Sequence, residues 1–408
     1  MRTIVFGICL LLSTSIYAQR NCGTQSYIEV LRSAQPQLQN KLSNIEAFLQ
    51  RQKMNFRVDG NFANPVIVIP VIVHVIYNDG SQNLSDEQVK SQVDALNRDF
   101  RRLNQDTSLT PQRFKAMAAD VSIEFKLATA DPFGRPTTGI IHKKTSLPFW
   151  KTDDKIKYNR EGGDDAWDSR YYLNIWVGNI QSVIGYSSVP GCDAATDGVV
   201  IATSVFGTLN RSGTYNMGRT AVHEVGHWLG LKHIWGDYYC GDDGVDDTPV
   251  QGNFTPGCPN TFRSSCSNGS LGDMYMNYMD YTGDACMNLF TNGQKLRMRS
   301  MFYEGGPRAG LLSSKGLNEP WMAEAPPVTI IPSAAIFPNP AMGDISINLD
   351  DSWIGSTIRI ADMNGVVLST FNITARIQKV PVAHLKQGMY LVQGDNGKRK
   401  LREKFIRL

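Results

Sequence analysis

Three of the six histidines in this 408-residue chain lie within eleven positions, in the stretch T-A-V-H-E-V-G-H-W-L-G-L-K-H. On a helix, His223 and His227 project from one face one turn apart, a spacing that allows two imidazoles to reach one Zn²⁺ at ~2.0–2.1 Å. Gly230 stands where the helix can end in a left-handed turn, after which the reversed chain can bring His233 to the same ion. Three neutral histidines leave the fourth zinc position for water, so the spacing predicts a catalytic zinc site.

Two alternatives compete with this interpretation. In one, a downstream glutamate is the third zinc ligand, but no glutamate occurs between Glu224 and Glu304. In the other, the chain is a secreted surface adhesin or binding protein with a structural zinc site. Structural sites are usually closed by a fourth protein ligand, and Glu224 beside the histidines has no obvious purpose in one. The residues therefore favour an enzyme in which His233 is the third ligand.

A second motif, N-Y-M-D-Y at residues 277–281, follows downstream of the histidines. The pattern H-E-x-x-H-x-x-G-x-x-H followed by this methionine motif resembles the metzincin metalloproteases. With D-D-T-P, G-C-P and four nearby cysteines, the region from Val66 to Gly316 resembles the pappalysin family, whose small members are microbial. The resemblance implies an α+β metzincin catalytic domain, with a backing helix and an active-site helix on a twisted mixed sheet. It also implies a zinc metalloendopeptidase of the EC 3.4.24 type, acting on protein or peptide substrates.

The resemblance carries specific roles over to matching residues. It implies that Glu224 is the general base and that the zinc ligands are His223, His227 and His233. Met279 would form the methionine turn, a hydrophobic floor beneath the zinc. Tyr281 would stabilise the oxyanion, with a purely packed aromatic side chain as the alternative. Asp284, close to the methionine turn, would face a basic residue just after the scissile bond.

The loop G-D-D-G-V-D-D-T-P crowds carboxylates in a way that suits a hard cation, although a solvated acidic loop is the alternative. The resemblance favours structural calcium, and its implied ligands are Asp243, the Val245 carbonyl, Asp247 and Thr248. Six cysteines remain after the predicted signal peptide, an even number that favours disulfides in an exported chain, with 15 possible pairings. The crossed pattern of the family implies Cys240–Cys266 and Cys258–Cys286.

The segment R-N-C-G-T around Cys22 resembles the cysteine switch of metzincin zymogens. A thiolate is a better zinc ligand than water, so Cys22 would occupy the fourth zinc position until cleavage near Arg57. The alternative is a disulfide between Cys22 and Cys192. The first interpretation predicts a latent zymogen.

The N-terminal residues predict export. Arg2, an apolar run from Ile4 to Leu12 and Ala18 before a cleavage point are typical of a secretory signal peptide, and the apolar run is too short for a membrane span. Lys and Arg number 41 against 38 Asp and Glu, a balance that indicates no nucleic-acid partner. We expect a secreted or cell-surface monomer, exported through the periplasm.

Several elements must position the histidines. A run of β-branched residues from Val66 to Tyr77 predicts a buried strand, and the amphipathic stretch after Ser85 predicts a helix with Ser85 as its N-cap. Strand-like stretches follow at residues 121–128, 171–180 and 198–202, an order typical of a mixed sheet with a helix across it. I-G-Y-S-S-V-P at 184–190 stands where the metzincin clan has an edge strand that pairs with substrate.

The chain divides into five predicted parts: a signal peptide at 1–18, a pro-segment at 19–59, the catalytic domain at 60–320, a Pro/Ala-rich linker at 321–332 and a β-sandwich at 333–408. In the last part, F-P-N-P-A, D-M-N-G and L-K-Q-G-M-Y-L-V resemble the C-terminal sorting domain of the type IX secretion system of Bacteroidota. The resemblance implies interaction with that machinery, usually followed by removal of the domain. A carbohydrate- or protein-binding sandwich is the alternative.

Overall fold

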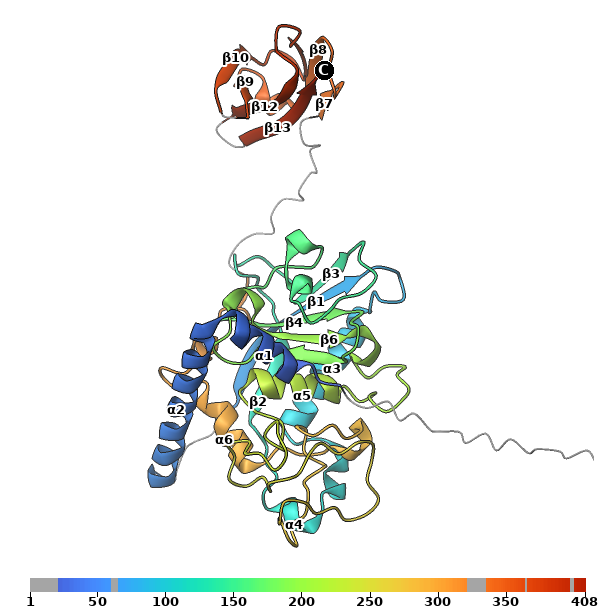
Figure 1. Ribbon diagram of the computed structural model, residues 1–408, viewed down its shortest axis with the longest axis vertical. Coiled ribbons are helices and arrows are strands. Elements are labelled where there is room, and N and C mark those ends of the chain that lie inside the picture. The colour runs from blue at the N-terminus through green and yellow to red at the C-terminus, as the bar shows by residue number, and fades with distance from the viewer. Residues whose placement is uncertain (1–20, 60–64, 321–334, 364, 397–399) are drawn as a thin grey trace, which may run out of the picture. The chain divides into compact units, whose positions relative to one another are not determined.

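The computed structural model describes residues 21–59, 65–320, 335–363, 365–396 and 400–408 (Figure 1). These residues belong to two compact units, Met1–Ala323 and Glu324–Leu408. The described residues do not include the predicted signal peptide or the predicted linker. Near the predicted cleavage region at Arg57, only the backbone is described.

The first unit is built on one six-stranded sheet, whose strand order is β2-β1-β4-β6-β5 with β3 also paired to β1. Its strands are β1 (Ile67–Tyr77), β2 (Ile123–Leu127), β3 (Ile140–Lys144), β4 (Leu173–Gly178), β5 (Gly185–Ser187) and β6 (Val199–Ala202). All pairs are parallel except β5 with β6, which makes β5 an antiparallel edge strand. β1 is buried along most of its length because it is central, which explains its continuous apolar run.

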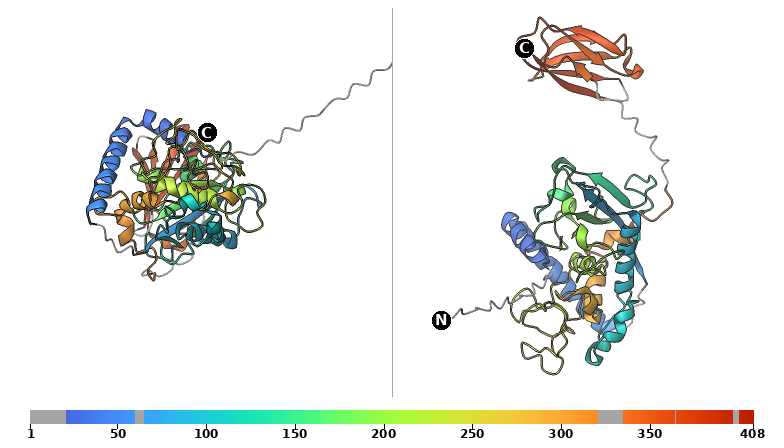
Figure 2. Two further views of the ribbon diagram at one scale, coloured as in Figure 1. Left: turned by 90° about the horizontal axis from the view of Figure 1, so that it is seen from below. Right: turned by 90° about the vertical axis from the view of Figure 1, so that its right-hand side faces the viewer.

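Two helices pack together against this sheet (Figure 2). The backing helix α3 (Asp86–Phe100) begins at Ser85, whose hydroxyl accepts a hydrogen bond from the Gln88 N–H at 3.3 Å. The active-site helix α5 (Arg219–Trp228) is buried at every position and contacts β5 and β6. A helix buried on all sides at this place holds its side chains in fixed directions, which a metal site requires.

Three further helices complete the described part of the first unit: α1 (Thr24–Ala34), α2 (Pro36–Asp59) and α6 (Asn292–Ser300), with the single helical turn α4 (Gln112–Lys115) beside them. α1 and α2 belong to the predicted pro-segment and lie along one side of the unit, with α2 next to α6 (Figure 1). The Glu46 carboxylate of α2 accepts two hydrogen bonds from the Arg297 guanidinium of α6, at 3.0 and 2.6 Å. The helices of the predicted pro-segment are therefore folded onto the rest of the first unit.

The second unit is an all-β sandwich of antiparallel sheets, with orders β10-β9-β12-β13 and β11-β8-β7. Its strands are β7 (Ala335–Phe337), β8 (Asp344–Asn348), β9 (Thr357–Asp362), β10 (Val367–Asn372), β11 (Ile377–Pro381), β12 (Gly388–Asp395) and β13 (Lys400–Arg407). Alternate residues of facing strands, such as Ile345, Ile358 and Val392, fill a core of its own.

The predicted fold class is confirmed: a mixed sheet with a backing and an active-site helix is followed by an all-β unit. β3 was not predicted, because it is short and lacks a continuous apolar run. In the described part of the chain no helix is both long and apolar enough to cross a membrane.

Candidate metal centre and catalytic cleft

The turn after α5 is built by Gly230. Its φ of +85° is left-handed, a conformation that favours glycine, and a Cβ at this position would lie 2.0 Å from Met301 Cε, so the methionine end would have to move. The Gly230 N–H donates to the His227 carbonyl at 2.8 Å and the Leu231 N–H donates to the Gly226 carbonyl at 3.0 Å, which closes the helix end. The chain then reverses as predicted and returns His233 to the helix.

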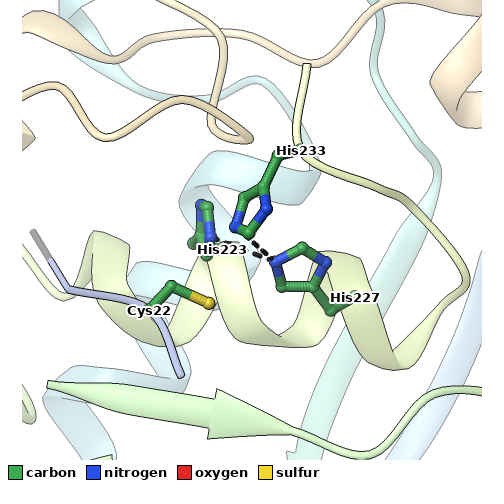
Figure 3. Close-up of side chains that lie close together, drawn as sticks. All are labelled: Cys22, His223, His227 and His233. Atoms are coloured by element: carbon green, nitrogen blue, oxygen red, sulfur yellow. Dashed lines mark hydrogen bonds between the residues drawn. The ribbon is translucent and has the colours of Figure 1, made fainter. Parts of the chain in front are cut away.

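The three histidines point toward one another, and each presents its Nε2 atom to the other two (Figure 3). His227 Nε2 lies 3.2 Å from His223 Nε2 and 3.1 Å from His233 Nε2. All three rings are buried. Three inward-facing Nε2 atoms at these separations form the facial set of donors that a tetrahedral metal ion requires.

The outer nitrogen of each imidazole is held by an acceptor. His223 Nδ1 lies 2.7 Å from the Tyr278 carbonyl, His227 Nδ1 lies 2.9 Å from the Leu231 carbonyl, and His233 Nδ1 contacts the Asp237 carboxylate. These acceptors place the ring protons on Nδ1 and leave the Nε2 lone pairs pointing inward. Burial, with the neighbouring His233, lowers the pKa of His227 to about 3, so its imidazole is neutral and able to ligate.

Cys22 supplies the fourth atom of the cluster. Its Sγ points toward the imidazoles (Figure 3), and one ligand atom from each of the four residues lies within 4.8 Å of the others. Burial, reinforced by the Glu224 carboxylate, raises the pKa of the Cys22 thiol, so binding a cation here would release a proton. Cys22 and Cys192 are both free in the described structure, so the alternative disulfide between them is not formed.

The pro-segment also contacts Glu224. The Thr24 hydroxyl donates to Glu224 Oε2 at 2.8 Å, and the Cys22 thiol lies 3.5 Å from the same oxygen. Both Thr24 and Glu224 are buried. The segment that places a thiol among the histidines thus also binds the carboxylate beside them.

The same few residues pair with the edge strand β5. The Gly23 N–H donates to the Gly185 carbonyl at 2.8 Å and the Ile184 N–H donates to the Asn21 carbonyl at 3.0 Å, in a parallel bridge of Cys22 with Gly185. The Ser187 N–H donates to the Thr24 hydroxyl at 2.9 Å. The pro-segment therefore covers the edge that is predicted to pair with substrate.

The methionine motif lies beneath the histidines. Met279 is fully buried, and a Cβ on Gly226 would lie 2.5 Å from its Sδ, so the helix approaches the methionine closely. The Tyr281 ring centroid is 5.0 Å from that of His233, and its hydroxyl donates to the Cys22 carbonyl at 3.3 Å. Tyr281 is thus turned toward the place where Cys22 enters.

The acidic loop has two separate parts. The Thr248 hydroxyl lies 2.9 Å from both carboxylate oxygens of Asp243 and donates to the Val245 carbonyl at 2.8 Å. The Asp247 carboxylate instead accepts from the Thr291 hydroxyl at 2.6 Å and the Gly293 N–H at 2.9 Å, at the start of α6. The structure brings three of the four predicted calcium ligands together and turns the fourth toward a helix N-terminus.

The remaining predicted residues are also placed. The structure contains the two disulfides that the resemblance implies, Cys240–Cys266 and Cys258–Cys286. Asp284 is fully buried, and its Oδ2 accepts from the N–H groups of Met217 at 2.8 Å and Arg219 at 3.2 Å. This carboxylate therefore fixes the beginning of α5.

Sequence reasoning missed the buried charges that hold the helix start. The Arg219 guanidinium is fully buried and lies 3.2 Å from Asp99 Oδ2 and 2.6 Å from Asp106 Oδ2, and it donates to the Asp284 carbonyl at 2.5 Å. Asp99 comes from α3, so the network ties the backing helix to the active-site helix. No local spacing pattern joins residues this far apart in the sequence.

Comparison with known proteins identifies this arrangement. Residues 157–303 match the family model described as pregnancy-associated plasma protein-A. An extracellular metalloprotease of Verticillium alfalfae is 32% identical over 254 residues, which is 58% of this chain and 78% of the relative. One of Pyricularia oryzae is 30% identical over 286 residues, 66% of this chain and 88% of the relative. The chain belongs to the pappalysin family of metalloproteases.

Solved structures agree with the family. One is mature mirolysin of Tannerella forsythia in complex with a cleaved peptide, which is 48% identical to this chain. The match covers 60% of this chain and 96% of the mirolysin chain, with a TM-score of 0.59. A mutant of promirolysin from the same organism is 43% identical and covers 72% of this chain and 97% of its own, with a TM-score of 0.66. The comparisons give no support to the adhesin alternative.

The C-terminal unit of the protease also has a family. Residues 335–407 match the secretion system C-terminal sorting domain. The protease is thus a secreted or cell-surface metalloendopeptidase that acts on peptide bonds, requires a metal ion and is exported by the type IX secretion system. The residues at the histidine cluster fit such an ion in donor type, protonation and convergence.

Proposed function

We propose that the protein is a zinc endopeptidase, with His223, His227 and His233 as the zinc ligands. The supporting observation is the convergence of three buried Nε2 atoms, each with its Nδ1 held by an acceptor. Three nitrogen donors with the fourth position open to exchange is the usual zinc arrangement in hydrolases, whereas calcium and magnesium prefer oxygen.

When bound, zinc supplies a Lewis acid that lowers the pKa of water and polarises the scissile carbonyl. Glu224 takes the proton of the attacking water and returns it to the leaving amine. Its place on α5 one residue after His223 supports this role. The Tyr281 hydroxyl donates a hydrogen bond to the carbonyl oxygen as negative charge develops there, and its orientation toward Cys22 supports that position.

We further propose that residues 19–59 are a pro-segment that keeps the protease latent. Cys22 takes the fourth zinc position, Thr24 binds the general base, and residues 21–24 cover β5. The share of this chain that is covered rises from 60% for mature mirolysin to 72% for promirolysin, which supports an N-terminal pro-segment here too. Cleavage near Arg57 then leaves a mature catalytic domain within residues 60–320.

We also propose a structural calcium ion in the acidic loop, with Asp243, the Val245 carbonyl and Thr248 as ligands and Asp247 supporting the loop. Asp243 is buried, and burial raises the pKa of its carboxyl to about 7 despite the Thr248 hydrogen bond. A cation is the partner that lets a buried carboxylate keep its charge at neutral pH.

Casein cleavage by the mature protein tests the catalytic proposal. We expect cleavage that a chelator abolishes and zinc restores, with one zinc per chain by metal analysis. Glu224→Ala should lower the rate at least ~100-fold while zinc stays bound, because general base catalysis is lost. Glu304→Ala, which alters an exposed glutamate away from the cluster, is the matched control. Full activity in Glu224→Ala would contradict the mechanism.

Premature activity tests latency. Cys22→Ala should let the uncleaved zymogen hydrolyse a short peptide. Cys192→Ala, which alters the other free cysteine among the described residues, should remain latent. A Cys22→Ala zymogen as inactive as the unaltered one would contradict the switch.

A further inference from the structure

The pro-segment buries one aromatic side chain beside the edge strand. Tyr27, in the first turn of α1, is 3% exposed, and its ring centroid lies 5.0 Å from that of Tyr186 in β5. Its hydroxyl donates to Asp154 Oδ2 at 2.6 Å. A hydrogen bond of this length to a buried carboxylate is a strong one. The site around Tyr27, formed by Asp154, Lys157 and Tyr186 and called the Tyr27 pocket below, therefore contacts both the ring and the hydroxyl.

The wall of this pocket carries a buried ion pair. The Lys157 ammonium is fully buried, lies 2.8 Å from Asp154 Oδ1 and donates to the Thr196 carbonyl at 2.8 Å. Three aromatic rings surround it, with centroids 5.1, 5.0 and 5.5 Å from Nζ: Tyr27, Tyr186 and Trp176. Two of these rings belong to the catalytic unit and one to the pro-segment.

Removal of the pro-segment therefore leaves this pocket incomplete. Asp154 loses the nearer of the two phenols that donate to it and keeps the Tyr186 hydroxyl, 3.4 Å from its Oδ1. The Lys157 ammonium loses one of its three aromatic neighbours. An aliphatic side chain would replace neither contact, because it has no hydrogen-bond donor and no ring face. The pocket keeps a carboxylate, an ammonium and two ring faces of fixed position.

The edge strand directs side chains toward this pocket. Along residues 22–24, Cys22 and Thr24 face the zinc cluster and Glu224, whereas a Cβ on Gly23 would point to the other face, 3.2 Å from Thr152 Cγ2 and 3.3 Å from Tyr186 Cβ. Side chains alternate between the faces of an extended strand. Gly23 itself is helical, with φ −86° and ψ −3°, and Tyr27 reaches the pocket from α1. An extended peptide that pairs with β5 in place of the pro-segment directs a side chain to the Tyr186 face from the position that Gly23 holds.

We propose that the Tyr27 pocket, formed by Asp154, Lys157 and Tyr186, is a substrate subsite of the mature protease that selects tyrosine. This proposal rests on the proposed removal of the pro-segment. In the zymogen Tyr27 occupies the subsite, and in the mature enzyme a substrate tyrosine at one fixed distance from the scissile bond replaces it. The pocket prefers tyrosine to phenylalanine, because Asp154 accepts the phenol proton.

A tyrosine walk through a peptide substrate tests the subsite. Mature protease is given fluorogenic peptides that differ at one position, which carries Tyr, Phe or Ala in turn, at each of the three places on either side of the cleaved bond. We expect one position at which Tyr exceeds Phe roughly tenfold in kcat/KM, since a hydrogen bond to a charged acceptor is gained. The difference should lie mainly in KM, because the contact is present in both ground state and transition state.

Two variants give the test its control. Asp154→Asn removes the charge but suits the left-handed φ of +62° at this residue, since asparagine tolerates that conformation, and it should lower the Tyr-to-Phe ratio several-fold. Asp153→Asn alters the neighbouring carboxylate, which accepts a hydrogen bond from the Lys155 N–H at 3.3 Å, and should keep the ratio.

The outcomes separate the two proposals. If mature protease cleaves casein but no position distinguishes Tyr from Phe by more than about twofold, the subsite is refuted and the zinc endopeptidase stands. An equal Tyr-to-Phe ratio in Asp154→Asn and the unaltered protease would also refute the subsite. If Asp154→Asn does not fold, the walk with the unaltered protease decides alone. If no substrate is cleaved, casein included, both proposals fail.

Discussion

Replacing Thr24 by valine removes the hydroxyl that the pro-segment places on the proposed general base. Valine keeps the shape of the side chain but loses the 2.8 Å hydrogen bond to Glu224 Oε2, and it leaves the buried Ser187 N–H without its 2.9 Å acceptor. A hydrogen bond to a charged group contributes about 1.5–3 kcal/mol, and an orphaned buried donor costs about 1–3 kcal/mol. Even the lower part of the combined range, about 3 kcal/mol, shifts the docking equilibrium of the pro-segment at least about 100-fold toward the open form.

The assay is the initial rate at which intact zymogen hydrolyses a short fluorogenic peptide, with a gel to confirm that no chain is cleaved. Thr24→Val should show activity that the unaltered zymogen lacks. Thr24→Ser keeps the hydroxyl and should remain latent, while Cys22→Ala is the active reference. Equal latency of the valine and serine variants, with Cys22→Ala active, would refute the reasoning that Thr24 restrains Glu224.

Three further predictions follow from other contacts. Gly226→Ala places a Cβ 2.5 Å from Met279 Sδ, so it should destabilise the catalytic unit by about 1–2 kcal/mol in urea unfolding, less so when combined with Met279→Ala. Burial raises the pKa of Asp243 to about 7, so the contribution of its protonated carboxyl to stability falls as pH rises from about 4 to about 7. With chelator present, the melting temperature should fall over this pH range. Calcium or Asp243→Asn should make the fall smaller. The Arg297 hydrogen bonds lower the pKa of Glu46 to about 2, so the stabilisation from this contact is complete above about pH 4.5 and is lost as pH falls toward 2. At pH 7, Glu46→Gln should speed amide hydrogen exchange in α2. An unchanged exchange rate would show that the Glu46–Arg297 pair does not hold the helix.

The metal centre could be predicted because its information is local. His223 and His227 are one helical turn apart, and Gly230 determines where the helix ends, so short-range geometry brings His233 back. The strand of residues 66–77 and the helix after Ser85 were predictable for the same reason, since the strand has a continuous β-branched apolar run and the helix has apolar residues at helical spacing.

Other features depend on contacts between distant parts of the chain. Arg219 is held by carboxylates more than a hundred residues earlier, and their pairing follows from how α3 and α5 pack. Asp247 is adjacent to residues around Asp243 in sequence, yet it turns to the N-terminus of α6, where the Gly293 N–H favours an anion. Tyr27 carries no motif, and its role follows from the buried charge that the fold places beside it.

The contacts that we propose to keep the zymogen latent lie close together in the sequence. The thiol, the hydroxyl on Glu224 and the pairing with β5 all come from residues 21–24, so they form and break together. Their strength in the zymogen also depends on the chain that joins α2 to β1, because a tethered segment rebinds at an effective concentration of about millimolar. Cleavage of that connection leaves every contact intact. The cut segment then rebinds at the concentration of the protein itself, which is lower than the effective concentration of the tethered segment. Activation therefore requires dilution or destruction of the released segment as well as cleavage, and a substrate that fills the Tyr27 pocket favours the release by competing for the same edge.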